Sequence, residues 1–527
     1  MKFFFTSALA LCALTSALAA PAPTALPPAT QLEIESLLRH PGIQNARIGV
    51  AVVALGEALT PAQFPALPYD NGAQPLLFGR DETKRFTPAS NFKLFTATWA
   101  LKTLGPKATL QTQVVAAPVE FLKDGAWPVN ETPPTALTLI GGGDPSLDSA
   151  AIKAMARQIT DKIAGDDKGY FIVRAQNSPA GDLLNAEFGG RRYPDGWTLD
   201  DALWYYGPVV TGLAVNRNQV DVTIVGAEKA SELATTQSDP AAPFPILSTV
   251  TTVTKDDARA GKISWDRGDA DSPLGQTLRL RGFIAVGAET TEGIAVPDPT
   301  QWAANILADE IKAAGGKIAQ ISGYKTEQSA VVATHQSAPM GTLINRFLKN
   351  SDNLYGEMLL RRAGATVPDE PLPPNSGASI SSDGLAAIAH RDMIRWLVQN
   401  KVPTQGLRLS DGSGLSRYDT LTPLAITRLL GVAQTLDGGD LFYSSLPIAG
   451  VDGTLRNRFK GSAAEGNLHA KTGTFSIVNC LSGYVTTRDG QRLAVSILTN
   501  FVEDGELARR WQGRVMATLA NASWAEK

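Results

Sequence analysis

The 527-residue sequence has few of the residues that bind metals or form disulfides. It contains two cysteines and four histidines, and no two histidines have the spacing of a zinc-binding pair. We therefore expect no metal and no other cofactor. Cys12 lies in an N-terminal apolar segment, so a chain that loses this segment keeps only Cys480 and forms no internal disulfide.

Neither sign of charge dominates the chain, whose formal net charge is −3 at pH 7. A near-neutral balance gives no sign of a basic surface for nucleic acid, and we expect no nucleic-acid partner. The chain also lacks the Gly-x-Ser-x-Gly elbow, which argues against a Ser-His-Asp hydrolase of that type. The Gly-Gly-Gly-Asp-Pro turn at 141–145 is not a phosphate loop, because no Lys-Ser/Thr follows it.

A long apolar run occurs at the N-terminus, from Phe3 to Leu18, and it predicts a secretory signal peptide. Lys2 supplies the positive start, and Ala17-Leu18-Ala19 supplies small residues at the cleavage positions. We predict a signal peptide over 1–19 and a Pro-rich linker over 20–30. An uncleaved membrane anchor is the alternative, for which the run is short. The expected location is secreted, in the periplasm or cell envelope, and peripheral association with the wall or membrane is left open.

Ser90 and Lys93 form the first candidate catalytic pair. Thr87 is a suitable N-cap and Pro88 suits the first helical position, so the sequence predicts a helix with Ser90 in its first turn. Residues three apart lie on one helical face, where a lysine that loses its proton can activate a serine hydroxyl. Such a pair alone more often marks a solvated helix edge.

Two later tripeptides change the interpretation of this pair. Ser351-Asp352-Asn353 alone is more often a turn or a helix cap, and Lys471-Thr472-Gly473 alone is more often the end of an exposed strand. Together with Ser90-x-x-Lys93, in this order, they form the motif set of the penicillin-recognising serine acyl-enzymes. The combination favours a serine acyl-transfer enzyme.

With these motifs the chain resembles the class C low-molecular-mass penicillin-binding proteins, which are D-alanyl-D-alanine carboxypeptidases/endopeptidases. The resemblance extends over nearly all of the chain after the signal peptide, and five further segments take part in it. They are Gly142-Gly143-Asp144-Pro145, Tyr193-Pro194-Asp195-Gly196-Trp197, Leu213-Ala214-Val215-Asn216, Asp411-Gly412-Ser413-Gly414-Leu415-Ser416 and Gly450-Val451-Asp452-Gly453-Thr454.

The resemblance implies a catalytic role for five residues. Ser90 attacks the penultimate D-alanine carbonyl and becomes acylated, and Lys93 takes its proton. Ser351, with Lys471 nearby, passes a proton to the leaving D-alanine. Asn353 holds the acyl side chain of the substrate and helps to orient Lys93. The expected partner is a peptidoglycan stem peptide ending in D-Ala-D-Ala, and β-lactam antibiotics are expected inhibitors.

The same resemblance implies how the substrate is bound. Lys471 and Thr472 hold the terminal carboxylate, and the backbone N–H groups of Ser90 and Thr474 form the oxyanion hole. Gly473 would let the substrate backbone approach the strand closely. Arg417, Phe475 and Ser476 are expected near the side chain of the third stem-peptide residue, which is diaminopimelate in the related proteins.

Two alternatives stay open at this point. A class A β-lactamase shares the three motifs but needs a glutamate for deacylation, and no Glu-x-x-Leu-Asn occurs between Asn353 and Lys471. A non-catalytic peptidoglycan-binding protein on the same fold is the second, against which intact Ser90 and Lys93 argue. The sequence does not decide between carboxypeptidase and endopeptidase.

The expected fold class is α/β (α+β), a penicillin-binding/β-lactamase-like transpeptidase domain with an antiparallel sheet flanked by helices. We predict this catalytic domain over 31–109 and 333–527. Glycine and proline punctuate short strand-like runs between these parts. We interpret them as two nested β-rich inserted domains, one over 110–136 and 218–332 and the other over 137–217.

Overall fold

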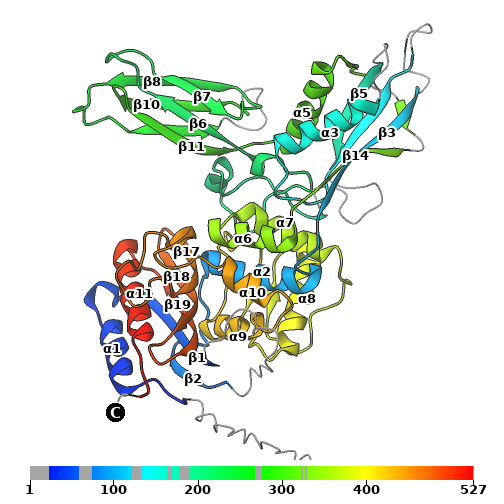
Figure 1. The fold of residues 1–527 in the computed structure, drawn as a ribbon. Coiled ribbons are helices and arrows are strands. Elements are labelled where there is room, and N and C mark those ends of the chain that lie inside the picture. The colour runs from blue at the N-terminus through cyan, green and yellow to red at the C-terminus, as the bar shows by residue number, and fades with distance from the viewer. Residues whose placement is uncertain are drawn as a thin grey trace, which may run out of the picture.

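The computed structural model describes residues 23–57, 74–121, 127, 132–162, 169–176, 189–267, 276–321, 324–326 and 329–525. The predicted signal peptide at 1–19 lies outside these ranges. Figure 1 shows a body that contains both ends of the described chain, and an inserted part, drawn in cyan and green, that projects from it above α6 and α7.

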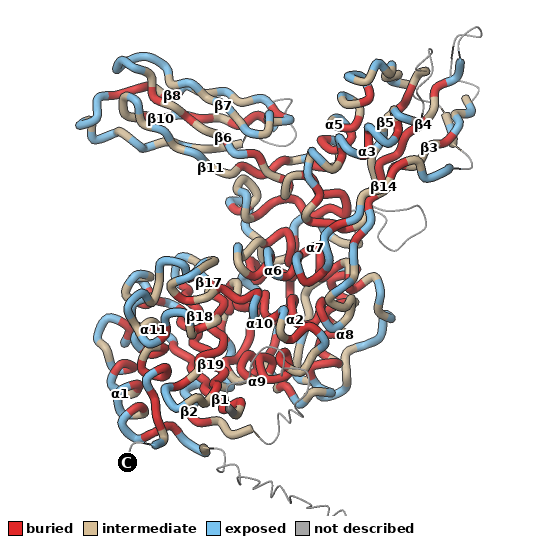
Figure 2. The backbone as a smooth tube through the Cα atoms, in the orientation of Figure 1, coloured by how far each residue is buried: buried red, intermediate tan, exposed pale blue. Residues whose placement is uncertain are grey.

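The body is built on an antiparallel sheet whose strand order is β17-β18-β19-β1-β2. Strands β1 and β19 lie far apart in the sequence but are neighbours in this sheet, where Arg47 of β1 pairs with Asn500 of β19. Most residues of β18, β19 and β1 are buried, as Figure 2 shows, so both faces of these strands are covered. This agrees with the long apolar run in β1, while β18 and β19 also bury polar residues such as Asn479 and Ser496. The strands are β1 (Arg47–Glu57), β2 (Leu76–Arg80), β17 (His469–Phe475), β18 (Val478–Thr486) and β19 (Gln491–Asn500).

Helices cover both faces of this sheet. On one face, α1 (Pro28–Leu38) and α11 (Gly505–Ala520) pack through an apolar stripe that includes Ile34, Trp511 and Val515. On the other face a larger core surrounds Trp99 and Phe347. Its helices are α2 (Lys93–Leu104), α6 (Met340–Asn350), α7 (Asn353–Gly364), α8 (Gly384–Gln399), α9 (Pro423–Ala433) and α10 (Gly439–Ser445).

The inserted part shares one hydrophobic core but contains three sheets. The first has the order β12-β5-β4-β3-β13, and β14 also pairs with β3, on the edge opposite β4. Helices α3 (Ser149–Lys162) and α5 (Pro299–Ala313) pack on this sheet. Its strands are β3 (Gln111–Phe121), β4 (Thr135–Ile140), β5 (Tyr170–Gln176), β12 (Lys317–Ile318), β13 (Tyr324–Thr326) and β14 (Ala330–Gln336). The others are β11-β6-β7 and β8-β10-β9, made of β6 (Gln219–Val225), β7 (Thr235–Asp239), β8 (Ile246–Val253), β9 (Ile263–Arg267), β10 (Leu278–Ala285) and β11 (Glu289–Ala295).

The predicted fold class is confirmed, and several local predictions need correction. Strand β3 pairs with β4 across the proposed boundary at 136/137. The sheets of the insert therefore do not follow the predicted division into two nested domains. The domain boundaries themselves stay a prediction. The linker predicted over 20–30 ends earlier, because Pro28 opens α1. Helix α3 was not foreseen. Cys480 lies in the core as expected, and burial raises the pKa of its thiol to about 12.

Candidate active site

Ser90 lies in a 3₁₀ turn, Ala89–Phe92, and α2 begins only at Lys93. The predicted helix start at Thr87 and Pro88 is therefore wrong. The capping position is Pro88, which makes no side-chain hydrogen bond, and Thr87 lies before it, where its N–H and carbonyl bond the side-chain amide of Asn500 at 2.9 and 3.0 Å. Ala89 then takes a left-handed conformation (φ 46°), which directs the Ser90 turn into the cleft.

Lys93 is fully buried, and its ammonium contacts three oxygen atoms. Its Nζ lies 2.9 Å from Ser90 Oγ, 2.5 Å from Asn353 Oδ1 and 2.6 Å from the Ser413 carbonyl. The predicted base, Lys93, thus lies beside the predicted nucleophile, Ser90. The fold also places Asn353 beside Lys93. Burial lowers the pKa of Lys93 to about 8, although surrounding carboxylates act in the opposite direction.

Ser351 and Lys471 meet on the facing wall of the site. Ser351 ends α6 in a left-handed conformation (φ 58°, ψ 38°), and its hydroxyl accepts a hydrogen bond of 2.8 Å from Lys471 Nζ. Burial, and then the charge of Lys93, lower the pKa of Lys471 well below its usual value. Repulsion between the two lysines thus contributes to the pKa of Lys471, whereas burial is the leading cause at Lys93.

Gly473 on β17 packs directly against the turn that carries Ser90. A Cβ atom at this position would lie 2.7 Å from the Pro88 carbonyl oxygen and 3.0 Å from the Ser90 nitrogen. The sequence predicted that this glycine makes room for substrate. In the structure, position 473 needs glycine for a different reason, because the atoms closest to a Cβ there belong to the protein's own backbone.

We therefore expect Gly473→Ala to reduce acylation by benzylpenicillin by about tenfold or more, because the added methyl displaces the Ser90 turn from β17. The second-order acylation rate, followed by intact-protein mass spectrometry, measures this. Gly169→Ala, whose Cβ would meet nothing within 4 Å, is the control for a methyl group added without a close neighbour. An unchanged rate in Gly473→Ala would contradict the packing argument.

A buried carboxylate, Asp411, organises the loop that holds Lys93. Its two oxygens accept hydrogen bonds from the backbone of Ser413, Gly414 and Ser416, at 3.1, 2.6 and 2.7 Å. The indole of Trp197, from the insert, donates to the same carboxylate at 2.9 Å. Asp411 thereby fixes the Ser413 carbonyl that accepts from Lys93.

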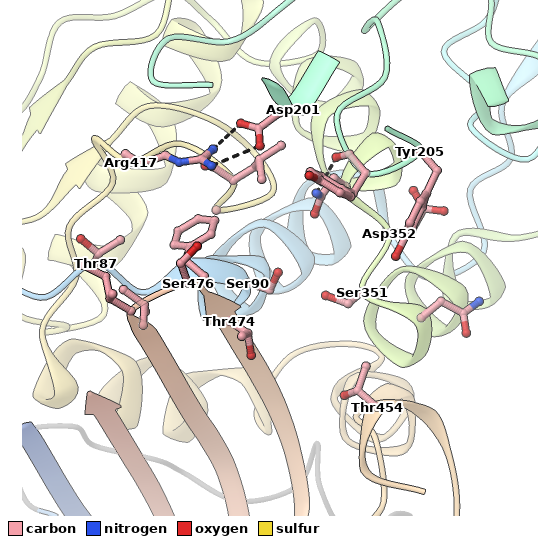
Figure 3. A pocket seen from close by; sticks show the side chains of 18 of the residues that line it. Thr87, Ser90, Asp201, Tyr205, Ser351, Asp352, Arg417, Thr454, Thr474 and Ser476 are labelled. Atoms are coloured by element: carbon pink, nitrogen blue, oxygen red, sulfur yellow. Dashed lines mark hydrogen bonds and ion pairs between the residues drawn. The ribbon is translucent and has the colours of Figure 1, made fainter. Parts of the chain in front are cut away.

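Ser90, Ser351 and Asn353 line a cleft of about 690 Å³ between the body and the insert. Figure 3 shows Ser90 at its centre, between Ser351 on one wall and Thr474 on the strand side. Thr474 and Ser476 are exposed to the cleft, while Thr472 lies beside it and shares a 2.8 Å hydrogen bond with the hydroxyl of Thr454. The structure thus brings together all five predicted catalytic residues and the predicted binding residues of β17.

One end of the cleft carries an ion pair. Arg417 binds the buried carboxylate of Asp201 with both terminal nitrogens, and its guanidinium lies over the Phe475 ring at 4.9 Å (Figure 3). Asp201 belongs to the insert, so this ion pair links the insert to the body at the cleft. Among the described residues, no group of three His, Cys, Asp or Glu side chains could hold a metal ion.

Several lining residues were not predicted as site residues, among them Tyr205, Tyr206, Arg217 and Thr454. Thr454 ends a motif that the sequence already singled out, and Arg217 directly follows another. Their position in or beside a motif was the available signal. The two tyrosines carry no such signal, because only the fold brings the insert to the cleft.

Comparison with known proteins agrees with this geometry. The model of the D-Ala-D-Ala carboxypeptidase 3 (S13) family matches residues 50–521. The chain belongs to this family. It is 30% identical over 490 residues to a D-alanyl-D-alanine carboxypeptidase of Actinomadura sp. (strain R39), covering 89% of this chain and 80% of the relative.

Two further comparisons support the enzyme's assignment. A penicillin-sensitive carboxypeptidase A of Dictyostelium discoideum is 25% identical over 433 residues, or 79% of this chain and 77% of the relative. The crystal structure of penicillin binding protein 4 (dacB) from Haemophilus influenzae aligns with a TM-score of 0.68 at 18% identity, over 92% of this chain and 97% of that one. The predicted family, fold and D-Ala-D-Ala carboxypeptidase/endopeptidase class are thus confirmed.

Proposed function

We propose that the enzyme hydrolyses D-Ala-D-Ala ends or crosslinks of peptidoglycan stem peptides through an acyl-enzyme on Ser90, with Lys93 as the general base. The observation that carries this proposal is the set of three contacts made by Lys93 Nζ. An ammonium has three donors, and here each has one acceptor. When Lys93 loses a proton, the two acceptors that have no proton to give, Asn353 Oδ1 and the Ser413 carbonyl, keep the remaining N–H groups. The lone pair then faces Ser90 Oγ.

The proton lost by Ser90 has a route to the leaving group. Ser90 attacks the carbonyl, Lys93 takes its proton, and the tetrahedral oxyanion is stabilised by the backbone N–H groups of Ser90 and Thr474. Ser351 then gives its hydroxyl proton to the departing D-alanine nitrogen, and Lys471, which donates to Ser351 Oγ at 2.8 Å, stabilises the developing alkoxide. The proton held by Lys93 returns to Ser351 Oγ, so the net transfer is from Ser90 to the leaving amine and Lys93 is again neutral. In deacylation, water attacks the Ser90 ester and gives a proton to Lys93, which passes it to Ser90 Oγ as the acyl group leaves as a carboxylic acid.

The terminal carboxylate of the substrate would bind beside β17, near Thr472 and Lys471. The Thr454–Thr472 hydroxyl pair supports this placement, because a hydroxyl that accepts from its partner keeps its own proton available for an anion. A carboxylate at this site selects peptides with a free D-alanine end. Crosslink cleavage uses the same contact, since the amine donor of a crosslink also carries an α-carboxylate.

The Arg417–Asp201 pair would meet the side chain of the third stem residue, together with Phe475 and Ser476. A diaminopimelate side chain ends in both an ammonium and a carboxylate, which complement Asp201 and Arg417 respectively. Only part of Arg417 is exposed (39%), so its charge acts in a partly desolvated site.

We expect Arg417→Met to lower kcat/KM for a diaminopimelate-containing tetra- or pentapeptide by about tenfold, the usual cost of one charge-assisted contact. A matched peptide with a neutral third residue should be affected much less. Steady-state D-alanine release from the two peptides measures the ratio. Arg510→Met, at an exposed position of α11, is the control, and an equal loss on both peptides would assign Arg417 a purely structural role.

For location, we propose export by the 1–19 segment and action in the periplasm or cell envelope, where peptidoglycan lies, with any contact to wall or membrane peripheral. The apolar run and its cleavage-site residues support this. As a separate finding, none of the helices formed by the described residues is long and apolar enough to span a bilayer.

The decisive experiment treats the mature chain with benzylpenicillin and measures both the intact mass and D-alanine release from a D-Ala-D-Ala peptide. One stable penicilloyl group per chain, together with D-alanine release, is the expected result. Fast penicillin turnover without an adduct would favour the β-lactamase alternative. Neither adduct nor release would favour a non-catalytic wall-binding protein.

A further inference from the structure

A strained turn in the insert is the feature that the proposed chemistry does not yet use. Asn216, Arg217 and Asn218 have φ angles of 49°, 59° and 56°, so three consecutive non-glycine residues are left-handed. L-residues adopt this conformation rarely, and runs of it persist only where surrounding contacts impose them. The question is which contacts impose this turn and what it presents.

Two asparagine side chains fix the turn. Asn216 accepts from the Ser149 backbone at 3.0 Å and donates to the Ser149 hydroxyl at 2.6 Å. Asn218, fully buried, accepts from the Val215 backbone at 3.0 Å and donates to the Val209 carbonyl at 2.8 Å. The turn is thus anchored on both sides of Arg217.

The Gly-Gly-Gly-Asp-Pro segment at 141–145 and the residues that follow it also help to hold this turn in place. The Gly143 N–H donates to the Gly212 carbonyl at 2.9 Å, and the Asn216 N–H donates to the Leu147 carbonyl at 3.0 Å. A Cβ on Gly141 would lie 2.3 Å from the Gly212 carbonyl oxygen. Two motifs that the sequence singled out therefore form one support, and the residue that they present is Arg217.

Arg217 faces Asp352, the middle residue of the Ser351-Asp352-Asn353 tripeptide. Arg217 Nε lies 2.8 Å from Asp352 Oδ2, an ion pair between a side chain that is 33% exposed and one that is 7% exposed. The other carboxylate oxygen, Oδ1, accepts from the Tyr355 N–H at 3.4 Å at the start of α7. Asp352 is therefore fixed from both sides, between two residues assigned to catalysis.

We infer that Arg217 is a positioning residue, which holds Asp352 and thereby sets the geometry of Ser351 and Asn353, and offsets the negative charge of Asp352 near Lys93. This inference rests on the proposed function. It makes the insert part of the catalytic apparatus, since one of its own motifs completes the Ser-Asp-Asn turn from outside the body.

The charges around Lys93 predict a change in pH dependence that a purely structural role of Arg217 would not produce. Carboxylates from α7 and the 411–419 loop act on Lys93 and raise its pKa: Asp411, Asp352, Glu357 and Asp419. The charge of Lys93 in turn lowers the pKa of Lys471, after the larger effect of burial. Without Arg217, the charge of Asp352 is uncompensated and favours the ammonium form of Lys93. A higher pH is then needed to obtain the free base.

The test compares Arg217→Gln with Arg259→Gln. Arg259 forms an ion pair of the same length, 2.8 Å, with Asp257 on the insert surface, away from the cleft. Arg217→Gln should lower the second-order rate of acylation by benzylpenicillin by about tenfold, within the range for coupled neighbours. Its pH–rate profile should move upward by roughly half a pH unit. Arg259→Gln should change neither.

A double-mutant cycle with Asp352→Asn separates positioning from general destabilisation. If the two residues act as a pair, Arg217→Gln in the Asp352→Asn background should lower the rate by less than about twofold. Arg217→Lys keeps the charge, so it should retain the wild-type pH profile while recovering only part of the rate. It also serves if the glutamine variant does not fold.

Acylation of the wild type distinguishes failure of the proposed Ser90 chemistry from failure of the positioning role of Arg217. Failure of the proposed Ser90 chemistry leaves every variant, including wild type, without an adduct. A reactive wild type with an equally reactive Arg217→Gln, or full additivity in the cycle, overturns the positioning role. A lower melting temperature with an unchanged rate and pH profile also overturns it, because Arg217 would then be structural only.

Discussion

Replacing Ser90 by alanine is expected to abolish the penicilloyl adduct and to lower D-alanine release by at least about 10⁴-fold. The acyl-enzyme route needs an oxygen nucleophile at this position, and removal of a serine nucleophile commonly leaves only residual catalysis from binding and the oxyanion hole. Ser90 is only partly exposed, and its loss leaves Lys93 with the other two hydrogen-bond acceptors. The fold should therefore survive.

Intact-protein mass spectrometry and D-alanine release measure this effect, with thermal unfolding as the check on folding. Ser444→Ala is the matched control, because its hydroxyl is on the exposed side of α10 and donates to the Leu441 carbonyl of the same helix. A stable adduct on Ser90→Ala would contradict the assignment. Peptide mapping would then examine Ser351, the other serine hydroxyl assigned to the chemistry.

Replacing Lys93 by methionine should lower the acylation rate by roughly 10³-fold, the middle of the range for general-base catalysis. Methionine is of similar length and removes the only group within hydrogen-bond distance of Ser90 Oγ among the contacts found in the described residues. It also leaves Asn353 Oδ1 and the Ser413 carbonyl unpaired, so some stability is lost. Lys102→Met, at an exposed position on the same helix, is the control.

The pH dependence of the wild type tests the same assignment without a mutation. Burial lowers the pKa of Lys93 to about 8, and the base must be neutral to act. The acylation rate should therefore rise about tenfold per pH unit below pH 8 and level off above it. A flat profile between pH 6 and 9, or no loss in Lys93→Met, would rule out Lys93 as the base.

The sequence was most informative where chemistry dictates residue type and order. Three short motifs far apart in the chain predicted that Ser90, Lys93, Ser351, Asn353 and Lys471 share one site. The structure joins Lys93 to Ser90 and Asn353 by hydrogen bonds, and joins Lys471 to Ser351 by another. The strand β1 was also recognisable, because both of its faces are covered and it is a long apolar run.

The sequence was least informative where tertiary contacts override local preference. Thr87 is a good N-cap by type, but Asn500 occupies its backbone groups, and the helix begins later. Arg217 resembles an ordinary surface arginine, because nothing local shows that its turn is left-handed or that Asp352 lies opposite. Both errors concern pairs of residues that only the folded chain brings together.

The pairing of β1 with β19 has a consequence for the order in which the molecule assembles. Arg47 meets Asn500, so β1 has no partner on that side until nearly all of this sequence is available. Closing so long a loop precedes any reward from the contacts, which makes such topologies slow to fold. During synthesis, the body is therefore the part that is begun first and completed last.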